Sequence, residues 1–481
     1  MLWLSLYLPR LPLEIYTRSA PRNDALIVSQ GHGRECSVLH ANAAARQQGV
    51  QQGMSVAAAR ALVADIQHCP RDHVAEMQTL QRLAAWAGQY TSMVSVQMPH
   101  ALLLEIGGSL QLFGGMRRLW SKLAQDMGEL GFESLLAVAP TPTAAYWLAY
   151  AQQSVIITAR AEIMHVLGRL PVAQLPWAPV VLDKLQAVGL RYMRDVWRLP
   201  REGLARRFGV DLLTQMDQAL GHSADPRSAY VAPATFSAAI TLPAPTTDSA
   251  ALVFAAQRLL LELAGFLRAR GAGVQYFELS CSAGRSAATK ITIGTAHAHR
   301  HVEQWRILVR EHLEKLQISA PVDGLQLRAP QIETVADRSG DMFDAQNAGV
   351  STLWLERVRA RLGNDVINGV CAVAEHRPEY AWHTTPPDLS VNKNQTQHHH
   401  ALPDRPLWLL AQPLAIRAER GRLWYGGVLH KVRGPERIES GWWDQRPMTR
   451  DYYVVENVAG IRYWVFRDNA EGRWFLHGVF W

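Results

Sequence analysis

Few side chains near the N-terminus could hold a metal for phosphoryl transfer. Two apolar segments, residues 2–8 and 101–106, are typical of neighbouring buried strands, and the polar residues on or beside them are Ser5, His100 and Glu105. Magnesium-assisted transfer needs one or two carboxylates beside the substrate phosphates, because Mg²⁺ is a hard cation that prefers oxygen ligands. An imidazole is a poor replacement. These strands therefore lack the adjacent carboxylates that such chemistry requires.

Other acidic residues lie too far along the chain to replace these carboxylates. No acidic residue lies between Glu76 and Glu105, and the first aspartate is Asp24. An active metal site would need ligands relocated from elsewhere in the fold, and Glu14 and Glu105 are the residues whose removal would test this. His100 is interpreted as an ordinary surface residue after a proline.

A second metal hypothesis comes from the sequence AHAHRH, in which His297, His299 and His301 alternate as on one face of a strand. No matching acidic or cysteine ligand lies nearby, so a plain strand face is the alternative. The cysteines are far apart and form no C-x-x-C pair: Cys36, Cys69, Cys281 and Cys371. Disulfide scaffolding, zinc sites and other cofactors are therefore not expected.

Chain length and net charge limit the number of domains and the class of partner without identifying the function. The chain has 481 residues, 48% of them hydrophobic, which predicts three or four domains with ample cores. Its net charge of +7 favours a polyanionic partner such as nucleic acid. The apolar start lacks a basic leader and is interrupted at Pro9, and no uncharged apolar run is long enough to cross a bilayer. We expect a reduced, cytoplasmic, nucleoid-associated protein with no membrane partner.

Periodicity predicts the elements that position these residues. A small helical insertion, 26–76, contains an alanine-rich helix at 55–64, and a longer helix follows around 80–90. Asp248-Ser249 begins an amphipathic helix that ends at Gly271. Alternating segments predict strands at 274–280 and 289–295, and a basic helix is predicted at 302–316.

The C-terminal part of the chain differs from the rest in its tryptophan content and its pattern of apolar residues. Residues 405–481 hold seven of the sixteen tryptophans, mostly in short alternating segments such as 461–466, which indicates a small β-rich module. Aromatic side chains at this density form a core, stack on bases or anchor a protein partner. About half of them are needed for the core.

Five segments, in order, resemble the Y-family (DinB/UmuC-like) translesion DNA polymerases. The family's palm strand reads roughly Ser-Leu-Asp-Glu-Ala-Tyr-Leu-Asp, whereas residues 98–105 read MPHALLLE, so its two metal-binding carboxylates correspond to His100 and Ala101. The family's first metal ligand corresponds to Ser5. In the fingers-like sequence VLHANAAAR, Arg46 matches a nucleotide-pocket residue but the nucleotide-facing tyrosine is Ala43.

The resemblance continues beyond the palm. Residues 135–149, LLAVAPTPTAAYWLA, are similar to a segment whose second lysine faces the triphosphate, but no lysine occurs between Lys122 and Lys184. Residues 185–209 resemble the thumb, with its helix-hairpin-helix turn, Leu-Pro and terminal Phe-Gly. The metal-ligand, tyrosine and lysine positions of the nucleotide site thus depart from the family pattern together.

The tail narrows the resemblance to one subgroup. Residues 435–481 contain Arg-Ile, Gly-Trp-Trp, Arg-Asp-Tyr-Tyr, Trp-Val-Phe and Trp-Phe-Leu-His-Gly in succession. This succession is similar to the C-terminal signature of the ImuB subgroup, which keeps the polymerase architecture without its metal ligands. The resemblance implies a catalytically degenerate protein that is not an enzyme and has no catalytic residues of its own.

The implied fold class is α+β and multidomain. It combines a right-hand polymerase architecture (palm, fingers, helix-hairpin-helix thumb and α/β little finger) with a small β-rich C-terminal module. The expected domains are palm-like 1–25 and 77–165, fingers-like 26–76, thumb-like 166–235, little-finger-like 236–331, a linker with a short helix at 332–404, and a tryptophan-rich partner-binding module at 405–481.

In the thumb, the turn at Gly189 with Arg191, Arg206 and Arg207 is the predicted contact with DNA phosphates. An ordinary helix C-cap with solvated arginines is the alternative. The resemblance implies binding to primer-template DNA without regard to sequence.

The resemblance also implies protein partners: the sliding clamp, an error-prone homologue of the replicative polymerase catalytic subunit, and the RecA-like accessory protein ImuA. Met342-Phe343 is the candidate clamp anchor, although the leading glutamine of such peptides is Ser339 here and a linker that merely contains Met-Phe is the alternative. For the other partners, the candidate tail residues are Trp442, Trp443, Tyr452, Tyr453 and Trp474. Damage tolerance, induced mutagenesis and the SOS response are the expected context, with an active polymerase using relocated ligands as the alternative.

Overall fold

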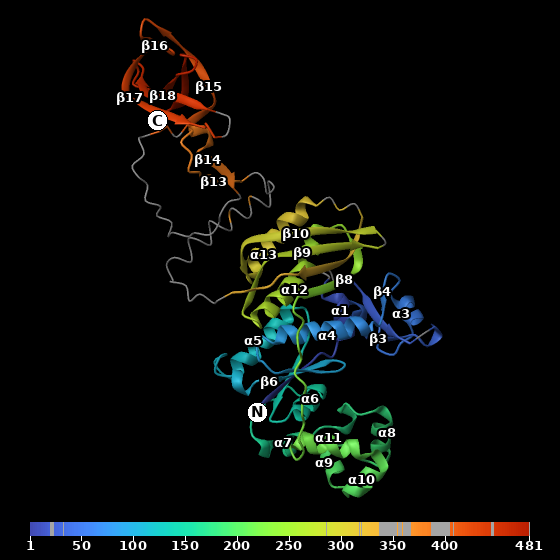
Figure 1. Ribbon diagram of the computed structural model, residues 1–481. Helices are drawn as coiled ribbons and strands as arrows, with labels where there is room; N and C mark the ends of the chain where they lie inside the picture. Colours follow the sequence, from blue (N-terminus) through green and yellow to red (C-terminus); the bar gives the residue numbers. More distant parts are fainter. Residues whose placement is uncertain are drawn as a thin grey trace. The chain divides into compact units, whose positions relative to one another are not determined.

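The chain folds into two compact units, Met1–Arg361 and Leu362–Trp481, which are shown in Figure 1. The computed structural model describes residues 1–19, 24–31, 33–284, 286–316, 318, 320–335, 354, 358, 367–385, 405–406, 408–443 and 447–480. All four cysteines are free thiols.

The first unit is built on an antiparallel N-terminal sheet in the order β5-β6-β1-β7. Its strands are β1 (Trp3–Tyr7), β5 (Val94–Gln97), β6 (Ala101–Glu105) and β7 (Leu135–Ala139). Its helices are α1 (Leu11–Thr17), α4 (His73–Ala87), α5 (Met116–Glu129) and α6 (Pro142–Tyr150). Leu4 and Leu6 pack with α4 and α5, while Trp3 packs with α6 on the opposite face. Burial on both faces explains the nearly continuous apolar run at 2–8, in which Ser5 is the one polar residue.

The insertion between α1 and α4 contains a three-stranded small sheet as well as helices, so the prediction of a purely helical insertion was incomplete. Its elements are β2 (Leu26–Gln30), β3 (Ser37–Ala41), β4 (Gln67–Pro70), α2 (Ala43–Gln47) and α3 (Val56–Leu62). Asn42 and Ser55 cap α2 and α3 with their side-chain oxygens. The strands were missed because each has only four or five residues and β4 joins the sheet by parallel pairing.

A helical region follows α6, with a buried core that is continuous with one face of the N-terminal sheet. It consists of α7 (Arg160–Leu167), α8 (Pro179–Ala187), α9 (Met193–Trp197), α10 (Arg201–Phe208) and α11 (Val210–Leu220). Gly189 has φ +82° and turns the chain between α8 and α9.

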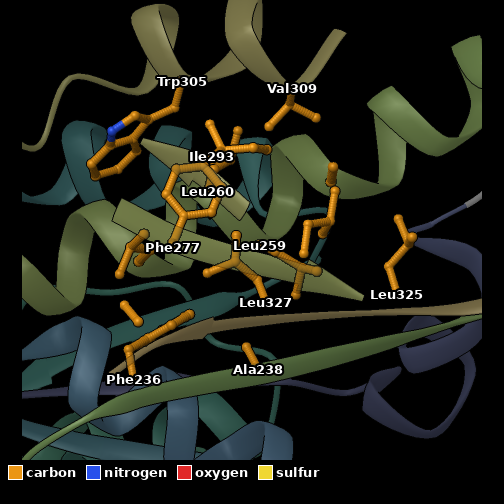
Figure 2. Close-up of a cluster of buried hydrophobic side chains, with 14 of the residues drawn as sticks. Phe236, Ala238, Leu259, Leu260, Phe277, Ile293, Trp305, Val309, Leu325 and Leu327 are labelled. Carbon is orange, nitrogen blue, oxygen red and sulfur yellow. The ribbon is translucent and has the colours of Figure 1, made fainter. Parts of the chain in front are cut away.

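The five-stranded sheet has two helices on one face (Figure 1). Its elements are β8 (Phe236–Thr246), α12 (Ser249–Arg268), β9 (Ala272–Ala283), β10 (Ser286–His299), α13 (Val302–Lys315), β11 (Val322–Ala329) and β12 (Glu333–Thr334). Figure 2 shows Trp305 and Val309 of α13 pointing toward Phe277 and Ile293 of the sheet. The helices and strands predicted at 248–316 are present. The strands β11 and β8, which complete the sheet beside β9, were not predicted separately.

α12 is, among the described residues, the one helix long and apolar enough to be considered as a membrane span, and 61% of its most apolar window is buried within the protein. Its leucines pack in the core of the five-stranded sheet. Arg258 and Glu262 interrupt its apolar run. The length and composition of α12 are therefore explained by its role as a core helix.

A buried ion triad joins the two halves of the first unit. The carboxylate of Glu262, on α12, accepts from Arg18 Nη1 at 2.5 Å and from Arg82 Nε, on α4, at 3.1 Å. The side chains of Arg18 and Glu262 are each only 1% exposed. Burial alone would raise the pKa of Glu262, but the two guanidinium groups outweigh burial and hold that pKa below its ordinary value.

Replacing Glu262 with Gln should destabilise the first unit by about 3 kcal/mol or more, because it leaves Arg18 as an uncompensated buried charge. Denaturant unfolding of the full chain, followed by far-UV circular dichroism, measures this loss. Glu303→Gln is the matched control, since Glu303 forms a surface pair with Arg306 and its side chain is 70% exposed. That control should cost less than about 1 kcal/mol. Equal losses in the two variants would contradict a structural role for the triad.

The second unit contains a closed barrel of six strands. These are β15 (Trp408–Glu419), β16 (Arg422–Trp424), β17 (Val428–Ser440), β18 (Met448–Glu456), β19 (Arg462–Asp468) and β20 (Trp474–Val479). Alternate residues form two apolar clusters, one around Val455 and Leu476 and the other around Tyr452, Trp464 and Phe466. The β-rich module predicted from the tryptophans is thus a barrel.

Part of the predicted linker belongs to this second unit. β13 (Gly369–Ala372) and β14 (Trp382–Thr385) form a hairpin. Glu379, between them, accepts from Arg450 Nη1 at 2.5 Å, and Glu375 accepts from Ser440 Oγ at 3.2 Å. These bonds attach the hairpin to the barrel. The polar composition on which the linker prediction rested does not reveal such pairing.

Candidate functional site

A cavity of about 750 Å³ lies where strands β1 and β6 meet the small sheet and the helical region. Tyr7 is the last residue of β1, and residues 98–100 form the turn that connects β5 to β6. His40 of β3, Gln215 of α11 and Arg227 complete different walls. The cavity therefore occupies the position at which the sequence resemblance would place a polymerase active site.

The three degenerate positions lie at or just beneath this cavity. Ser5 is fully buried in β1, two residues before Tyr7, and its hydroxyl has no hydrogen-bond partner. Ala101 is fully buried and pairs with Tyr7 across β1 and β6. His100 lines the cavity and is half-buried, so it is less exposed than the sequence interpretation assumed. Its carbonyl accepts from the amide of Leu8.

Aromatic rings line much of the cavity. The rings of Tyr7 and Tyr150 are 5.2 Å apart, and Tyr146 meets Tyr150 edge-on at 5.9 Å. Trp147 and Trp177 form a second edge-on pair at 5.5 Å. Burial, followed by the neighbouring Tyr150, raises the pKa of Tyr7 to about 12. The phenol therefore stays neutral and cannot act as an anionic metal ligand near neutral pH.

The cavity offers little charge to a triphosphate or to a metal. Arg227 is the only lysine or arginine among its described lining residues, and Asp225 pairs with it at 2.8 Å. Arg227 also donates to Gln97 and Thr143. Burial is the first cause that lowers the pKa of both His40 and His100, so these imidazoles are neutral near neutral pH. The described lining residues include no carboxylate.

Glu14 and Glu105, the candidates for relocated ligands, serve local structure instead. Glu105 Oε1 accepts from the amides of Leu2 and Gly107 at 3.0 and 3.2 Å. Glu14 Oε1 accepts from the amide of Glu133 at 2.8 Å, and burial raises the pKa of Glu14 to about 7. Neither residue lines the cavity.

The raised pKa of Glu14 predicts a pH-dependent stability. A carboxyl group whose pKa rises from 4.5 to about 7 on folding stabilises the fold fully below pH 4.5 and loses that contribution as pH rises through 7. Denaturant unfolding at pH 5 and pH 8 should show a loss of roughly 3 kcal/mol that is absent from Glu14→Gln. Equal pH dependence in the two proteins would contradict the assignment.

The remaining predicted nucleotide and DNA residues do not converge on the cavity. Arg46, on α2, is exposed and does not line it. Gly189, Arg191, Arg206 and Arg207 are exposed in the helical region. The amide of Gly189 donates to Gln186 within its own turn. Phosphate contacts there would depend mainly on the arginine side chains.

Sequence reasoning missed several cavity residues, including Tyr146, Gln215, Gln218 and Arg227. They come from α6, α11 and the segment after α11. Only the tertiary packing of these elements brings them together, so the sequence held no local signal for them.

The histidines of the triplet make other contacts. His299 stacks on Trp305 at 5.3 Å, and burial, then His301 and His297, lowers the pKa of His299 to about 4. Within the described ranges, no group of three or more His, Cys, Asp or Glu residues is placed to hold a metal ion.

The predicted tail residues fall into different environments. Trp442 is 80% exposed and meets Trp443 edge-on at 5.3 Å, beside Arg377. Tyr453 and Trp474 are half-buried around Lys431.

Tyr452 is only 1% exposed, because it stacks on Trp464 at 4.1 Å and bonds to His477. The structure places Tyr452 in the barrel core and not on the surface expected of a partner-binding residue. Met342 and Phe343 lie outside the described residues.

Residues 13–149 match the model of the impB/mucB/samB family. The chain is 28% identical over 465 residues to Protein ImuB of Caulobacter vibrioides (strain NA1000 / CB15N), an alignment that covers 90% of this chain and 100% of the relative. The ImuB sequence of strain ATCC 19089 / CIP 103742 / CB 15 matches equally. These matches confirm the resemblance to ImuB-type members of the Y family.

Among solved structures, the chain is similar to DinB from Sulfolobus solfataricus, with 15% identity, a TM-score of 0.39 and coverage of 70% of this chain and 100% of that one. The insertion ternary complex of Dbh DNA polymerase gives 15% identity, a TM-score of 0.40 and the same coverage. The predicted α+β multidomain class with a β-rich C-terminal module is confirmed by the mixed sheets and helices of the first unit and by the barrel of the second.

Proposed function

We propose that this protein is a non-catalytic, polymerase-like scaffold in DNA damage tolerance, which binds DNA and brings a separate error-prone polymerase to it. The family match and the ImuB relative support a role in damage tolerance. The observation that carries the non-catalytic part is the cavity at the end of β1 and β6, whose described lining residues include no carboxylate. Without such ligands, magnesium cannot be held between the attacking oxygen and the phosphates.

The alternative, an active polymerase with relocated ligands, has less support. Glu14 is buried with a raised pKa, and Glu105 accepts two backbone amides at its own strand end. A metal would have to displace these contacts and deprotonate Glu14.

Primer extension tests the choice directly. The purified chain, with primer-template DNA, four nucleotides and magnesium or manganese, should extend no primer beyond a mock preparation, because no carboxylate pair is available to hold the metal. Extension absent from the mock preparation would refute the scaffold in its strict form. Extension lost in the double variant Glu14→Ala with Glu105→Ala would establish the relocated site.

DNA binding in this proposal falls to the helical region, which corresponds to the thumb. Arg206 and Arg207 are exposed in the last turn of α10 and have no ion-pair partner among the described residues. Arg201, on the same helix, is held by Asp217 through two bonds of 3.0 and 2.6 Å. Arginines without an ion-pair partner can neutralise DNA phosphates, which releases the counterions condensed on the DNA.

Arg206→Ala combined with Arg207→Ala should weaken binding to duplex primer-template and lower the slope of log affinity against log salt by about 2. Fluorescence anisotropy across a salt series measures both effects. The control Arg201→Ala should lower the slope by much less. A strong preference for one duplex sequence would contradict phosphate-based binding.

Partner recruitment in this proposal divides between two segments. Met342-Phe343 would anchor the sliding clamp, and the exposed pair Trp442 and Trp443 would anchor the error-prone polymerase subunit or the RecA-like accessory protein ImuA. Exposed tryptophans are frequent binding anchors because they bury a large area at small entropic cost. Tyr452 is excluded from this set by its burial.

Each pair serves as the control for the other. Met342→Ala with Phe343→Ala should weaken clamp binding roughly tenfold or more and leave the other partners and DNA unaffected. Trp442→Ala with Trp443→Ala should do the reverse. Pull-downs and biolayer interferometry with purified partners measure these affinities, and unchanged clamp binding in the first variant would place the clamp anchor elsewhere.

A further inference from the structure

The barrel carries more positive charge than its share of the chain. Residues 405–481 contain twelve lysine and arginine residues against eight aspartate and glutamate residues, a net charge of +4 out of +7 for the whole protein. About a sixth of the chain thus supplies more than half of its net charge. A polyanion is the partner that such a surface attracts.

The ion pairs of the barrel show where this charge is available. Among the described residues, its paired cations are Arg405 with Glu436, Arg417 with Glu419, Arg437 with Asp451, Arg450 with Glu379, Arg462 with Glu456 and Arg473 with Glu471. Arg420, Arg422 and Lys431 are exposed and form no ion pair among the described residues. They lie on the turn after β15, on β16 and on β17, which are consecutive elements.

Aromatic rings lie between these cations. Trp424 ends β16 and Tyr425 follows it, and both are exposed. Lys431 Nζ lies 4.3 Å from the ring centroid of Tyr453 and 4.8 Å from that of Trp474. β16 pairs with β17 through Leu423 and Leu429, which are buried on the inner side, so Arg422 and Trp424 face outward. Lys431, two residues after Leu429 and paired with the buried Val455, lies on the inner side and is exposed beside Tyr453 and Trp474. The two groups thus lie on the two faces of one pair of adjacent strands, which together form the β16–β17 wall.

We propose that this wall, formed by Arg420, Arg422, Trp424, Tyr425 and Lys431, binds single-stranded nucleic acid. The cations would neutralise phosphates, and the exposed rings would stack on unpaired bases. A duplex offers only its phosphates, because its bases are already stacked inside. The wall consists of other residues than the thumb arginines and the Trp442 and Trp443 pair, so it would add a second nucleic-acid surface to the protein.

Fluorescence anisotropy with the full chain tests this, using a labelled 20-nucleotide oligo(dT) and a duplex of equal length. Two variants are informative: Arg420→Ala, Arg422→Ala and Lys431→Ala together, and Trp424→Ala with Tyr425→Ala. Each should weaken binding to oligo(dT) about tenfold, and the aromatic variant should change duplex affinity by less than about twofold, because a duplex offers no unpaired bases to the rings. The cation variant should also lower the salt slope by about 2.

Matched controls separate this wall from general charge and from the thumb. Arg417→Ala, Arg462→Ala and Arg473→Ala together remove the same charge from exposed, ion-paired positions of the barrel. This variant, Trp442→Ala with Trp443→Ala, and Arg206→Ala with Arg207→Ala should each leave oligo(dT) affinity within about twofold.

Three outcomes would overturn the proposal. One is oligo(dT) affinity that is unchanged in the cation variant. Another is an equal loss in the paired-cation control, which would reduce the effect to net charge. The third is displacement of oligo(dT) by polyglutamate of equal charge, with no effect of Trp424→Ala and Tyr425→Ala, which would mark an acidic protein as the ligand. If the far-UV circular dichroism spectrum shows that the aromatic variant is unfolded, its affinity is not interpreted. The cation variant and the polyglutamate competition then test the proposal.

Discussion

The first unit depends on one buried carboxylate. Glu262 lies between two guanidinium groups from separate helices, so α1, α4 and α12 must all be in place before its desolvation is offset. Gly265, one turn further along α12, lies against Trp86 so closely that a Cβ atom would stand 2.0 Å from that ring. Charge pairing and close packing therefore select the same arrangement, which joins the N-terminal sheet to the five-stranded sheet.

This arrangement also fixes the elements around the cavity at the ends of β1 and β6. β1 leads directly into α1, so the strand that carries Ser5 and Tyr7 is fixed at one end by the helix that precedes Arg18. The cavity keeps its shape through hydrogen bonds and ring contacts, such as those of Arg227 with Gln97 and Thr143. The shape of the cavity therefore rests on contacts among the side chains of the chain itself.

The sequence predicted the elements whose signals are local. The apolar run at 2–8, the Asp248 cap of α12 and the alternation at 461–466 each describe one segment and its own burial, and each corresponds to an observed element. Features that depend on distant residues were not predictable. The Arg18–Glu262 pair joins positions 244 residues apart, and the attachment of Glu379 to Arg450 is invisible in a polar stretch that reads as a linker. Tyr452 was misjudged for the same reason, since only barrel closure buries it.

The residues that the resemblance aligns with the family's metal-binding carboxylates also affect the stability of the sheet. Clustered carboxylates repel one another unless a cation or a proton is present, so a metal-free active site carries an energetic cost. Ser5 and Ala101 remove that repulsion from the centre of the N-terminal sheet, where both side chains are fully buried. Neutral tyrosines then pack together beside the strand ends. The scaffold role proposed above requires no metal at this position, and a cavity lined by aromatic and neutral side chains is compatible with it.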